Sequence, residues 1–297
     1  MPQIASTVVL VLLALAATTA AQGPLQSDLR AQFERRLQDI ADGVDGVVGY
    51  VVEDLTAGAR VAARHEREPF PTASAIKVPV MYELIRQADE GRLRLDVAAP
   101  LDRAQVVGGS GVLQHLTTPA LSLRDHAALM MIVSDNTSTN IIIDAVGMGN
   151  VTARMRTLGM GDVLLRRKMM DAEAVRRGDE NVASPASLLR STVMLWKGEG
   201  LSESGRDVAR GILRLVPGAI RGAVPARVVV YSKTGSLDAV RAETAVVDLP
   251  GAPFGLAVMT TYLKDDAAGT RAIGEIAAAA FAYFERLASG GRYGRRQ

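Results

Sequence analysis

The sequence predicts an α/β protein of the α+β kind, in which both ends of the chain contribute to one antiparallel sheet flanked by helices. An all-helical lobe from the middle of the chain is inserted into this sheet. Short β-branched segments near residue 50 and again after residue 225 predict the strands. Helical patterns dominate from about residue 72 to residue 214. Strands at both ends with helices between them favour this single architecture.

Composition limits the classes of protein to consider. The chain has 297 residues, 48% of them hydrophobic, so it can bury a sizeable core in one large domain or two lobes. Its formal net charge is only +2 and no clustered basic face precedes the tail, so we expect no nucleic-acid partner. The absence of cysteine excludes disulfides and thiolate chemistry. The three histidines are isolated, so we expect no metal and no other cofactor.

The first 21 residues have the features of a secretory signal. An apolar run from Val8 to Ala17 is followed by small residues and then by the polar Gln22. We expect cleavage near Ala21, a secreted or periplasmic protein, and no stable membrane span in the mature chain. A retained membrane anchor is the alternative, although the apolar stretch is short for a bilayer span.

The predicted domain organisation follows from these patterns. We expect an α/β lobe made from residues 22–68 and 215–290, a helical lobe at 69–214, and a disordered Gly- and Arg-rich tail at 291–297. We expect the mature protein to be a monomer.

The N-terminal part of the α/β lobe predicts a helix and a hairpin. Apolar residues recur at helical spacing from Leu25 to Ile40. A β-branched segment at 47–54, a turn at 56–58 and a returning segment at 59–64 predict two paired strands.

The middle of the chain predicts a succession of helices. Prolines 69 and 71 precede a helix that runs to about Asp89, with Pro79 removing one backbone bond near its start. Ser122 and Asp125 resemble a capping box for a helix ending near Val133. Further helices are expected at 137–146, at 151–161 and from Ser184-Pro185 to Trp196. Residues 92–121 and the charged segment up to Val182 are expected to be connections.

Strand patterns return in the last third of the chain. Strands are expected at 227–232, 243–249 and 254–263, with Gly251 and Pro253 in the turn between the last two. An alanine-rich, amphipathic helix at 270–288 closes the fold.

A serine and a lysine three residues apart can form a reactive pair on one helical turn. Lys77 can reach back over the Ser74 hydroxyl, because residues three apart share a helix face. A serine becomes nucleophilic when a neighbour accepts its proton, and a lysine does so only if burial keeps it partly neutral. The apolar neighbours Ile76 and Val78 favour such burial. Alone, such a pair is more often a surface serine and a solvated lysine than a reactive pair.

Two further polar motifs strengthen the case for a site. Ser134-Asp135-Asn136 interrupts an apolar helical run, which indicates either a cap with satisfied bonds or a site. Lys233-Thr234-Gly235 follows a β-branched segment and places a cation and a hydroxyl at the edge of a strand. The motifs lie in this order, 60 residues from Ser74 to Ser134 and 99 from Ser134 to Lys233, a combination that chance rarely produces.

Together the motifs resemble those of the serine β-lactamase and penicillin-binding protein superfamily, and are most similar to its class A branch. The resemblance covers nearly all of the mature chain. It implies a class A β-lactamase-like fold and a serine hydrolase that acts on β-lactam amide bonds through an acyl-enzyme on Ser74. The implied partner is a small β-lactam or peptidoglycan-like substrate.

The resemblance implies a role for each residue that handles protons. Ser74 is the acylated nucleophile, and Lys77 accepts its proton or belongs to the base relay. Ser134 passes a proton to the leaving nitrogen. Lys233 sharpens the electric field at Ser134. The backbone amides of Ser74 and Ser236 form the oxyanion hole, where each donor commonly contributes about 3 kcal/mol.

The remaining implied roles concern substrate binding. Asn136, Thr234, Gly235 and Ser236 belong to the implied substrate-binding set, in which Asn136 holds the substrate amide, and Lys233 and Thr234 hold its carboxylate. Arg241 is a second carboxylate clamp or an ordinary surface arginine. Ser110, in the glycine-rich segment 108–111, belongs to a flexible lip of the site or to a surface turn.

One part of the class A pattern is missing. That branch carries a glutamate, followed shortly by an asparagine, in the loop before the Ser-Pro helix start, and this glutamate activates the water that removes the acyl group. Counting back from Gly178-Asp179-Glu180 places Met169 near its position. Asp171 or Glu173 supplies the base if the loop has another register; otherwise they pair with nearby arginines. We therefore expect slow deacylation, with a D-alanyl-D-alanine peptidase or esterase, or a covalent β-lactam-binding module, as alternatives.

Overall fold

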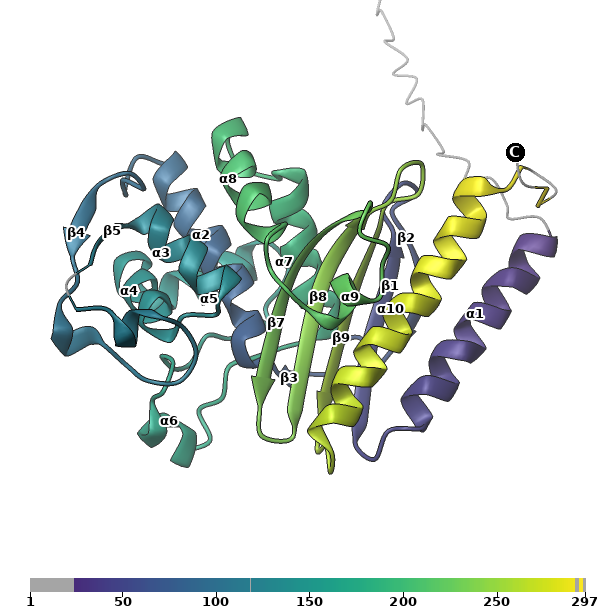
Figure 1. Ribbon diagram of the computed structural model, residues 1–297, viewed down its shortest axis with the longest axis horizontal. Helices are drawn as coiled ribbons and strands as arrows, with labels where there is room; N and C mark the ends of the chain where they lie inside the picture. Colours follow the sequence, from purple (N-terminus) through teal and green to yellow (C-terminus); the bar gives the residue numbers. More distant parts are fainter. Residues whose placement is uncertain (1–23, 118, 292–293, 296–297) are drawn as a thin grey trace, which may run out of the picture.

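The central feature of the fold is a five-stranded antiparallel sheet whose strands come from both ends of the chain (Figure 1). The computed structural model describes residues 24–117, 119–291 and 294–295, so the predicted signal and part of the predicted tail lie outside it. The strand order is β2-β1-β9-β8-β7. The strands are β1 (Val47–Asp54), β2 (Ala59–Arg64), β7 (Val229–Leu237), β8 (Val240–Asp248) and β9 (Phe254–Thr261). The predicted fold class is therefore confirmed.

Pairing between β1 and β9 joins the two ends of the chain. Their register runs from Val47 opposite Thr261 to Asp54 opposite Phe254. The β1–β2 hairpin has the residue bounds that the turn at 56–58 predicts. At the other side of the sheet, β7 is an edge strand, and it pairs with β8 through a tight hairpin in which Leu237 faces Val240.

Two long helices, α1 (Pro24–Asp42) and α10 (Asp266–Ser289), lie side by side over one face of the sheet (Figure 1). Stacked aromatic rings hold this layer together: Phe33 of α1 lies 4.6 Å from Tyr283 of α10, and Phe254 of β9 lies 4.5 Å from Phe284, between ring centroids. The short helix α9 (Ala219–Gly222) packs on the same face of the sheet.

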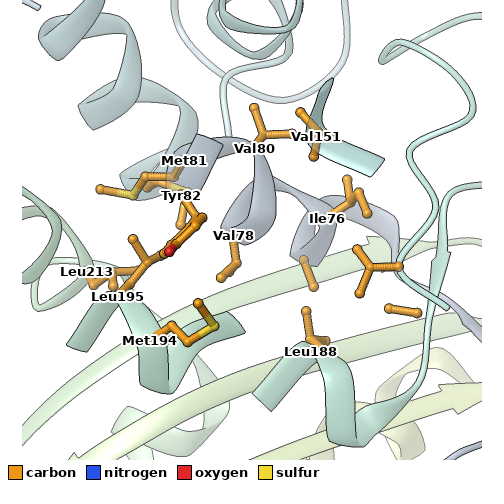
Figure 2. Packing of buried hydrophobic residues seen from close by; sticks show 14 of the residues in the cluster. Ile76, Val78, Val80, Met81, Tyr82, Val151, Leu188, Met194, Leu195 and Leu213 are labelled. Carbon is orange, nitrogen blue, oxygen red and sulfur yellow. The ribbon is translucent and has the colours of Figure 1, made fainter. Parts of the chain in front are cut away.

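The helices from the middle of the chain form a second buried core beside the other face. α2 (Lys77–Asp89) runs through it, and Figure 2 shows Val78 and Tyr82 of α2 near Met194 and Leu195 of α7 (Pro185–Lys197). The surrounding helices are α3 (Leu123–Ile132), α4 (Asn136–Val146), α5 (Met148–Thr157) and α8 (Glu203–Leu213). No helix within the described ranges is long and apolar enough to cross a membrane.

Helix starts agree with the capping signals in the sequence. Ser122 Oγ accepts the Asp125 N–H at 3.1 Å, and Asp125 Oδ2 accepts the Ser122 N–H at 3.0 Å, which completes the predicted capping box of α3. Ser184 caps α7, with Pro185 at its first position.

Several element predictions were wrong in detail. Residues 92–121 include two short paired strands, β4 (Ala98–Pro100) and β5 (Ala120–Ser122), and the 3₁₀ turns η2 (Arg103–Gln105) and η3 (Leu113–His115). The charged segment before Val182 contains the helix α6 (Ala172–Arg176). Strand β7 continues through the polar Lys233 to Leu237, past the predicted end at residue 232. These short or polar elements depend on tertiary partners, so local patterns do not reveal them.

Candidate active site

The sequence motifs meet at one cavity of about 500 Å³ between the sheet edge and the helical lobe. Ser74, Asn136, Ser236 and Ser110 line it on one side. The opposite wall comes from residues 167–176, with the apolar side chains Met169, Met170 and Val175 and the charged Arg167, Asp171 and Arg176. Five segments that are far apart in the sequence therefore line one cavity.

Ser74 lies in a 3₁₀ turn, η1 (Ala73–Ile76), immediately before α2, and not inside the α-helix as predicted. The preceding residue, Ala73, has a left-handed backbone with φ 47°, a conformation that costs an L-residue about 1–2 kcal/mol. Backbone strain of this kind often accompanies functional sites. Pro79 is the third residue of α2, in the first turn, where an α-helical N–H has no intrahelical partner.

Gly235 lets the edge strand β7 lie directly against the Ser74 turn. A Cβ atom at this position would be 2.5 Å from Thr72 O, 2.8 Å from Ala75 N and 2.9 Å from Ser74 N. No side chain fits at such distances. The glycine therefore brings the backbone of β7, including the next residue Ser236, close to the amide of Ser74.

Lys77 is completely buried and its amine has three acceptors. Nζ donates to Ser134 O at 2.8 Å, Ser134 Oγ at 3.1 Å and Asn136 Oδ1 at 3.2 Å. No hydrogen bond between Lys77 Nζ and Ser74 Oγ occurs within the described residues, so the expected direct pair is not formed in this state. The long side chain instead connects the start of α2 to the Ser134 turn.

Burial is the main influence on the Lys77 amine. It holds the pKa of Lys77 well below the usual range, and the positive charge of Lys233 lowers this pKa further. The nearby Asp135 carboxylate opposes both effects. A lysine with such a pKa can take up and release a proton, as the sequence analysis requires of this residue.

Ser134 connects two lysines through one hydroxyl. Its Oγ accepts from Lys77 Nζ at 3.1 Å and from Lys233 Nζ at 3.3 Å. Ser134 has a left-handed backbone with φ 55°, where the chain turns between α3 and α4. Asp135 secures this turn by accepting the N–H groups of Ser138 at 2.8 Å and Val112 at 2.7 Å.

Lys233 is also completely buried. Besides Ser134 Oγ, its Nζ donates to Thr234 O at 2.8 Å. Burial lowers the pKa of Lys233 to about 7, and the Glu243 carboxylate opposes this shift. Near neutral pH, Lys233 therefore exchanges its proton more readily than a solvated lysine would.

The other predicted binding residues differ in position. Asn136 Nδ2 donates to Gly108 O at 3.1 Å, and the Asn136 N–H donates to Ser110 O at 3.0 Å, which fixes the 108–111 segment at the cavity. Arg241 does not line the cavity. Its guanidinium donates to Leu237 O at 2.8 Å and pairs with Asp266 at 2.8 Å, so its donors serve the hairpin and α10.

The loop that forms the opposite wall is closed at its neck by a buried asparagine. Asn181 Oδ1 accepts the backbone N–H groups of Arg166 at 2.8 Å and Arg167 at 3.1 Å, and its Nδ2 donates to Arg167 O at 3.2 Å. An ion pair of 2.7 Å between Arg167 and Glu180 spans the same neck. Nothing in the local sequence distinguishes Asn181 from an ordinary loop asparagine.

Met169 is held in the cavity wall by another residue that the sequence analysis missed. Asn140 Oδ1 accepts the Met169 N–H at 2.8 Å, and Asn140 Nδ2 donates to Met169 O at 3.1 Å. Asn140 lies one helical turn after Asn136 on α4, and this spacing is a signal that could have revealed it. These two bonds hold the Met169 backbone in the cavity wall, near the position at which the resemblance predicts the class A glutamate.

The two proposed substitutes for that glutamate lie in different environments. Asp171 lines the cavity, but its Oδ1 caps α6 by accepting the Ala174 N–H at 2.9 Å. Glu173 does not line the cavity; its side chain is 79% exposed and lies 3.9 Å from Arg176. Within the described ranges, no cluster of three or more His, Cys, Asp or Glu residues could hold a metal ion.

Comparison with known proteins identifies relatives of the same kind. An imipenem-hydrolyzing beta-lactamase of Enterobacter cloacae is 29% identical over 209 residues, which cover 68% of this chain and 71% of that protein. Beta-lactamase L2 of Stenotrophomonas maltophilia is 28% identical over 69% of this chain and 67% of its own. A crystal structure of a beta-lactamase from Sphaerobacter thermophilus is 30% identical, with a TM-score of 0.78 over 84% of this chain and 97% of that one.

A second structural relative, PBP-A, has the same TM-score of 0.78 over 86% of this chain and 97% of its own, but at 24% identity it supports the fold alone. The family model described as the beta-lactamase enzyme family matches residues 31–284, almost the whole described chain. The chain therefore belongs to the beta-lactamase enzyme family, as a class A-like member of the serine β-lactamase and penicillin-binding protein superfamily.

Proposed function

We propose that this protein is a serine hydrolase that opens β-lactam rings through an acyl-enzyme on Ser74. The observation that carries the proposal is the hydrogen-bonded chain from Lys77 through Ser134 to Lys233, beside the cavity that Ser74 lines. Membership of the beta-lactamase family supports it, as do the two curated relatives, which both have beta-lactamase names. Export of the mature protein and action as a monomer belong to the same proposal.

In the acylation step, Ser74 Oγ attacks the lactam carbonyl carbon and its proton passes to Lys77. A neutral lysine amine has two donors and one lone pair, so it can keep two of its three present acceptors and take up the Ser74 proton. As the lactam C–N bond breaks, Ser134 gives its hydroxyl proton to the leaving nitrogen and is reprotonated from Lys77. Lys77 thus takes up one proton from Ser74 and gives one to Ser134, so it returns to its neutral form.

The oxyanion of this step needs donors that are already in place. We assign this role to the backbone amides of Ser74 and Ser236, because Gly235 brings β7 against the Ser74 turn. Asn136 lines the cavity and holds the substrate amide, while Lys233 holds the substrate carboxylate. Thr234 is not included in this role, because it stands opposite Glu243 in the strand register and does not line the cavity. Arg241 is not needed as a second clamp, since its donors are occupied at the hairpin.

Deacylation is the slow step in this proposal. Hydrolysis of the acyl-enzyme requires a base that activates water, and the thioether of Met169 cannot accept a proton from water. Of the two acidic residues nearby, Asp171 is the better substitute because it lines the cavity, whereas Glu173 is exposed outside it. One Asp171 oxygen is engaged by the start of α6, which leaves the other for water.

The position of Met169 also favours a second function, in which the acyl-enzyme persists. In that case the protein acts as a penicillin-binding D-alanyl-D-alanine peptidase or esterase, or as a covalent β-lactam-binding module. These functions share the acylation machinery and differ only in what removes the acyl group.

Mass spectrometry of the intact protein tests the proposal directly. Wild-type protein treated with benzylpenicillin should gain the mass of one acyl group, and Ser74→Ala should gain none. Ser204→Ala, at an exposed serine of α8, is the matched control and should be labelled like the wild type. Labelling of Ser74→Ala would refute the assignment of the nucleophile.

Nitrocefin then separates the functions. Turnover far beyond one equivalent supports hydrolysis, whereas a single stoichiometric burst supports the binding module. Cleavage of a D-alanyl-D-alanine peptide supports the peptidase.

A further inference from the structure

A buried glutamate lies behind the catalytic edge of the sheet, outside the cavity. Glu243 on β8 is 1% exposed and stands directly opposite Thr234 of β7 in the strand register. Because side chains alternate along a strand, Glu243 faces the α9 and α10 side of the sheet, while Lys233 faces the helical lobe. The carboxylate and the Lys233 amine are therefore separated by the sheet backbone and form no direct ion pair within 4.0 Å.

Two features show that the structure accommodates this carboxylate specifically. The backbone N–H groups of Ala219 and Ile220 donate to it at 2.9 Å and 3.3 Å. Gly218 makes room for it, since a Cβ atom there would lie 2.1 Å from Glu243 Oε1 and 2.9 Å from Thr234 Cγ2. Gly218 has an extended backbone that any residue can adopt, so the glycine is required by space and not by conformation.

Few charges are available to balance this carboxylate. The guanidinium of Arg221 is directed to backbone carbonyls, including Val216 O at 3.0 Å, and Lys233 is the other cation that acts on Glu243. Burial raises the pKa of Glu243 to about 7, and the Ile220 and Ala219 amides, Lys233 and Arg221 oppose that shift. A buried carboxylate costs several kcal/mol when unpaired, so its retention beside a catalytic strand suggests a use.

The surroundings of the Lys233 amine supply little negative charge to stabilise its protonated form. Its amine faces the Ser134 hydroxyl, and beyond this hydroxyl lies the amine of Lys77, a like charge when protonated. Its cross-strand partner Thr244 is neutral and bonds to Thr192 of α7 at 2.8 Å. Asp135 acts on Lys77, and Glu243 is the one carboxylate that opposes the lowered pKa of Lys233.

We propose that Glu243 is a positioning residue whose negative charge, acting through the sheet, keeps the Lys233 amine protonated so that it can donate to Ser134 Oγ during acylation. This inference rests on the proposed function of Ser74 and Ser134. Only the protonated lysine stabilises the developing negative charge on Ser134 as that hydroxyl gives up its proton. Glu243 thus sets the upper end of the pH range in which acylation is fast.

The sign of the effect follows from electrostatics. A negative charge near an amine raises the amine pKa, so removing it lets Lys233 lose its proton at lower pH. The alkaline limb of the pH–rate profile should then move to lower pH. The acidic limb, which we assign to protonation of Lys77, should stay in place because the charges that act on that amine are those of Lys233 and Asp135.

Glu243→Gln is the test, because glutamine keeps the size and one oxygen acceptor for the α9 amides but removes the charge. We expect the alkaline limb of the acylation rate with benzylpenicillin to move down by about one pH unit, so acylation at pH 8 falls about tenfold. At pH 6 the rate should remain close to that of the wild type. Glu203→Gln, at a side chain that is 87% exposed, is the control and should leave the profile unchanged.

Two results would overturn the inference: an unshifted profile, or a loss of rate that is equal at pH 6 and pH 8, which indicates a purely structural cap. If Glu243→Gln does not fold, Gly218→Ala displaces the carboxylate without removing it and should shift the limb in the same direction. An unshifted limb in folded Gly218→Ala would equally count against the role. Failure of the proposed function is distinguishable, because wild-type protein would then form no Ser74 adduct at any pH.

Discussion

The two walls of the cavity differ in how they treat polar groups. On the wall formed by α2, α4 and β7, two buried lysines both donate to the Ser134 hydroxyl, and one of them, Lys77, also donates to Asn136. On the wall formed by residues 167–176, apolar Met169, Met170 and Val175 face the cavity, and the Glu173 carboxylate is exposed outside it. In the proposed function, the first wall moves the protons of acylation, while the second offers one carboxylate, that of Asp171, to activate water.

Both walls are held in place by buried hydrogen bonds. Burying a lysine amine is costly unless each donor has a partner, and Lys77 meets that condition with three acceptors. On the other wall, the side-chain amide of Asn140 forms two buried hydrogen bonds with the backbone of Met169. The methionine wall is therefore as firmly built as the lysine wall, and it is not a disordered remnant. Three substitutions test whether acylation and deacylation depend on different walls of the cavity.

Lys77→Met should have the largest effect, and on acylation alone. It removes the proton acceptor while keeping an unbranched apolar side chain in the buried site, so acylation should slow by about 10³-fold. Stopped-flow measurement of nitrocefin acylation checks this. Lys197→Met, at an exposed lysine at the end of α7, is the control and should acylate at the wild-type rate. An unimpaired Lys77→Met protein would mean that another group accepts the Ser74 proton.

Met169→Glu should act on deacylation alone, with a smaller effect. It places a carboxylate in the wall position that Asn140 holds, so water beside the acyl group gains a base and the acyl-enzyme should decay about tenfold faster. The decay of the benzylpenicillin adduct by intact-protein mass spectrometry measures this rate. Met169→Gln has nearly the same shape without the charge and should decay like the wild type. Equal acceleration by both variants would show that side-chain packing, and not a base, limits deacylation.

Gly235→Ala should have the smallest effect on the rate, and it should also lower the free energy of unfolding. The new Cβ would overlap Thr72 O and Ala75 N, so β7 must move from the Ser74 turn, at a cost of about 1–3 kcal/mol in the free energy of unfolding. Acylation should fall about threefold, because the oxyanion donors move apart but are not removed. Urea unfolding and nitrocefin acylation measure the two quantities.

Gly211→Ala provides the matched control for that change. Nothing lies within 4 Å of a Cβ at this position of α8, so alanine should raise the free energy of unfolding by about 0.5–1 kcal/mol and leave acylation unchanged. Destabilisation by both changes would point to a general intolerance of glycine replacement.

Sequence patterns predicted much of the fold because its main elements carry local signals. The hairpin at 47–64, the capping box at Ser122 and the Ser184-Pro185 start of α7 each depend on residues within a few positions of one another. The polar end of β7 lacked such a signal. Lys233 and Thr234 look like residues beyond a strand, because the partners that make them part of it come from other elements, such as Ser134 and β8.

The residues of the candidate site could be predicted from the sequence, but the hydrogen bonds between them could not. The family resemblance named Ser74, Asn136 and Ser236, which line one cavity in the structure, whereas helical spacing suggested a direct contact between Lys77 and Ser74 that the described residues do not form. The clamps made by Asn140 and Asn181 join segments that are distant in sequence, so only tertiary structure shows them. Glu243 was missed because an acidic residue in a strand ordinarily faces solvent.

The pairing of β1 with β9 also determines when reactivity can arise. A strand near the start of the chain has no neighbour on one side until a strand near the end has formed, and contacts this distant in sequence form slowly. The amine of Lys233 and the amide of Ser236 come from that same late part of the chain. A protein still folding should therefore be unreactive towards penicillin, and a fluorescent penicillin would report the fraction of molecules in which folding is complete.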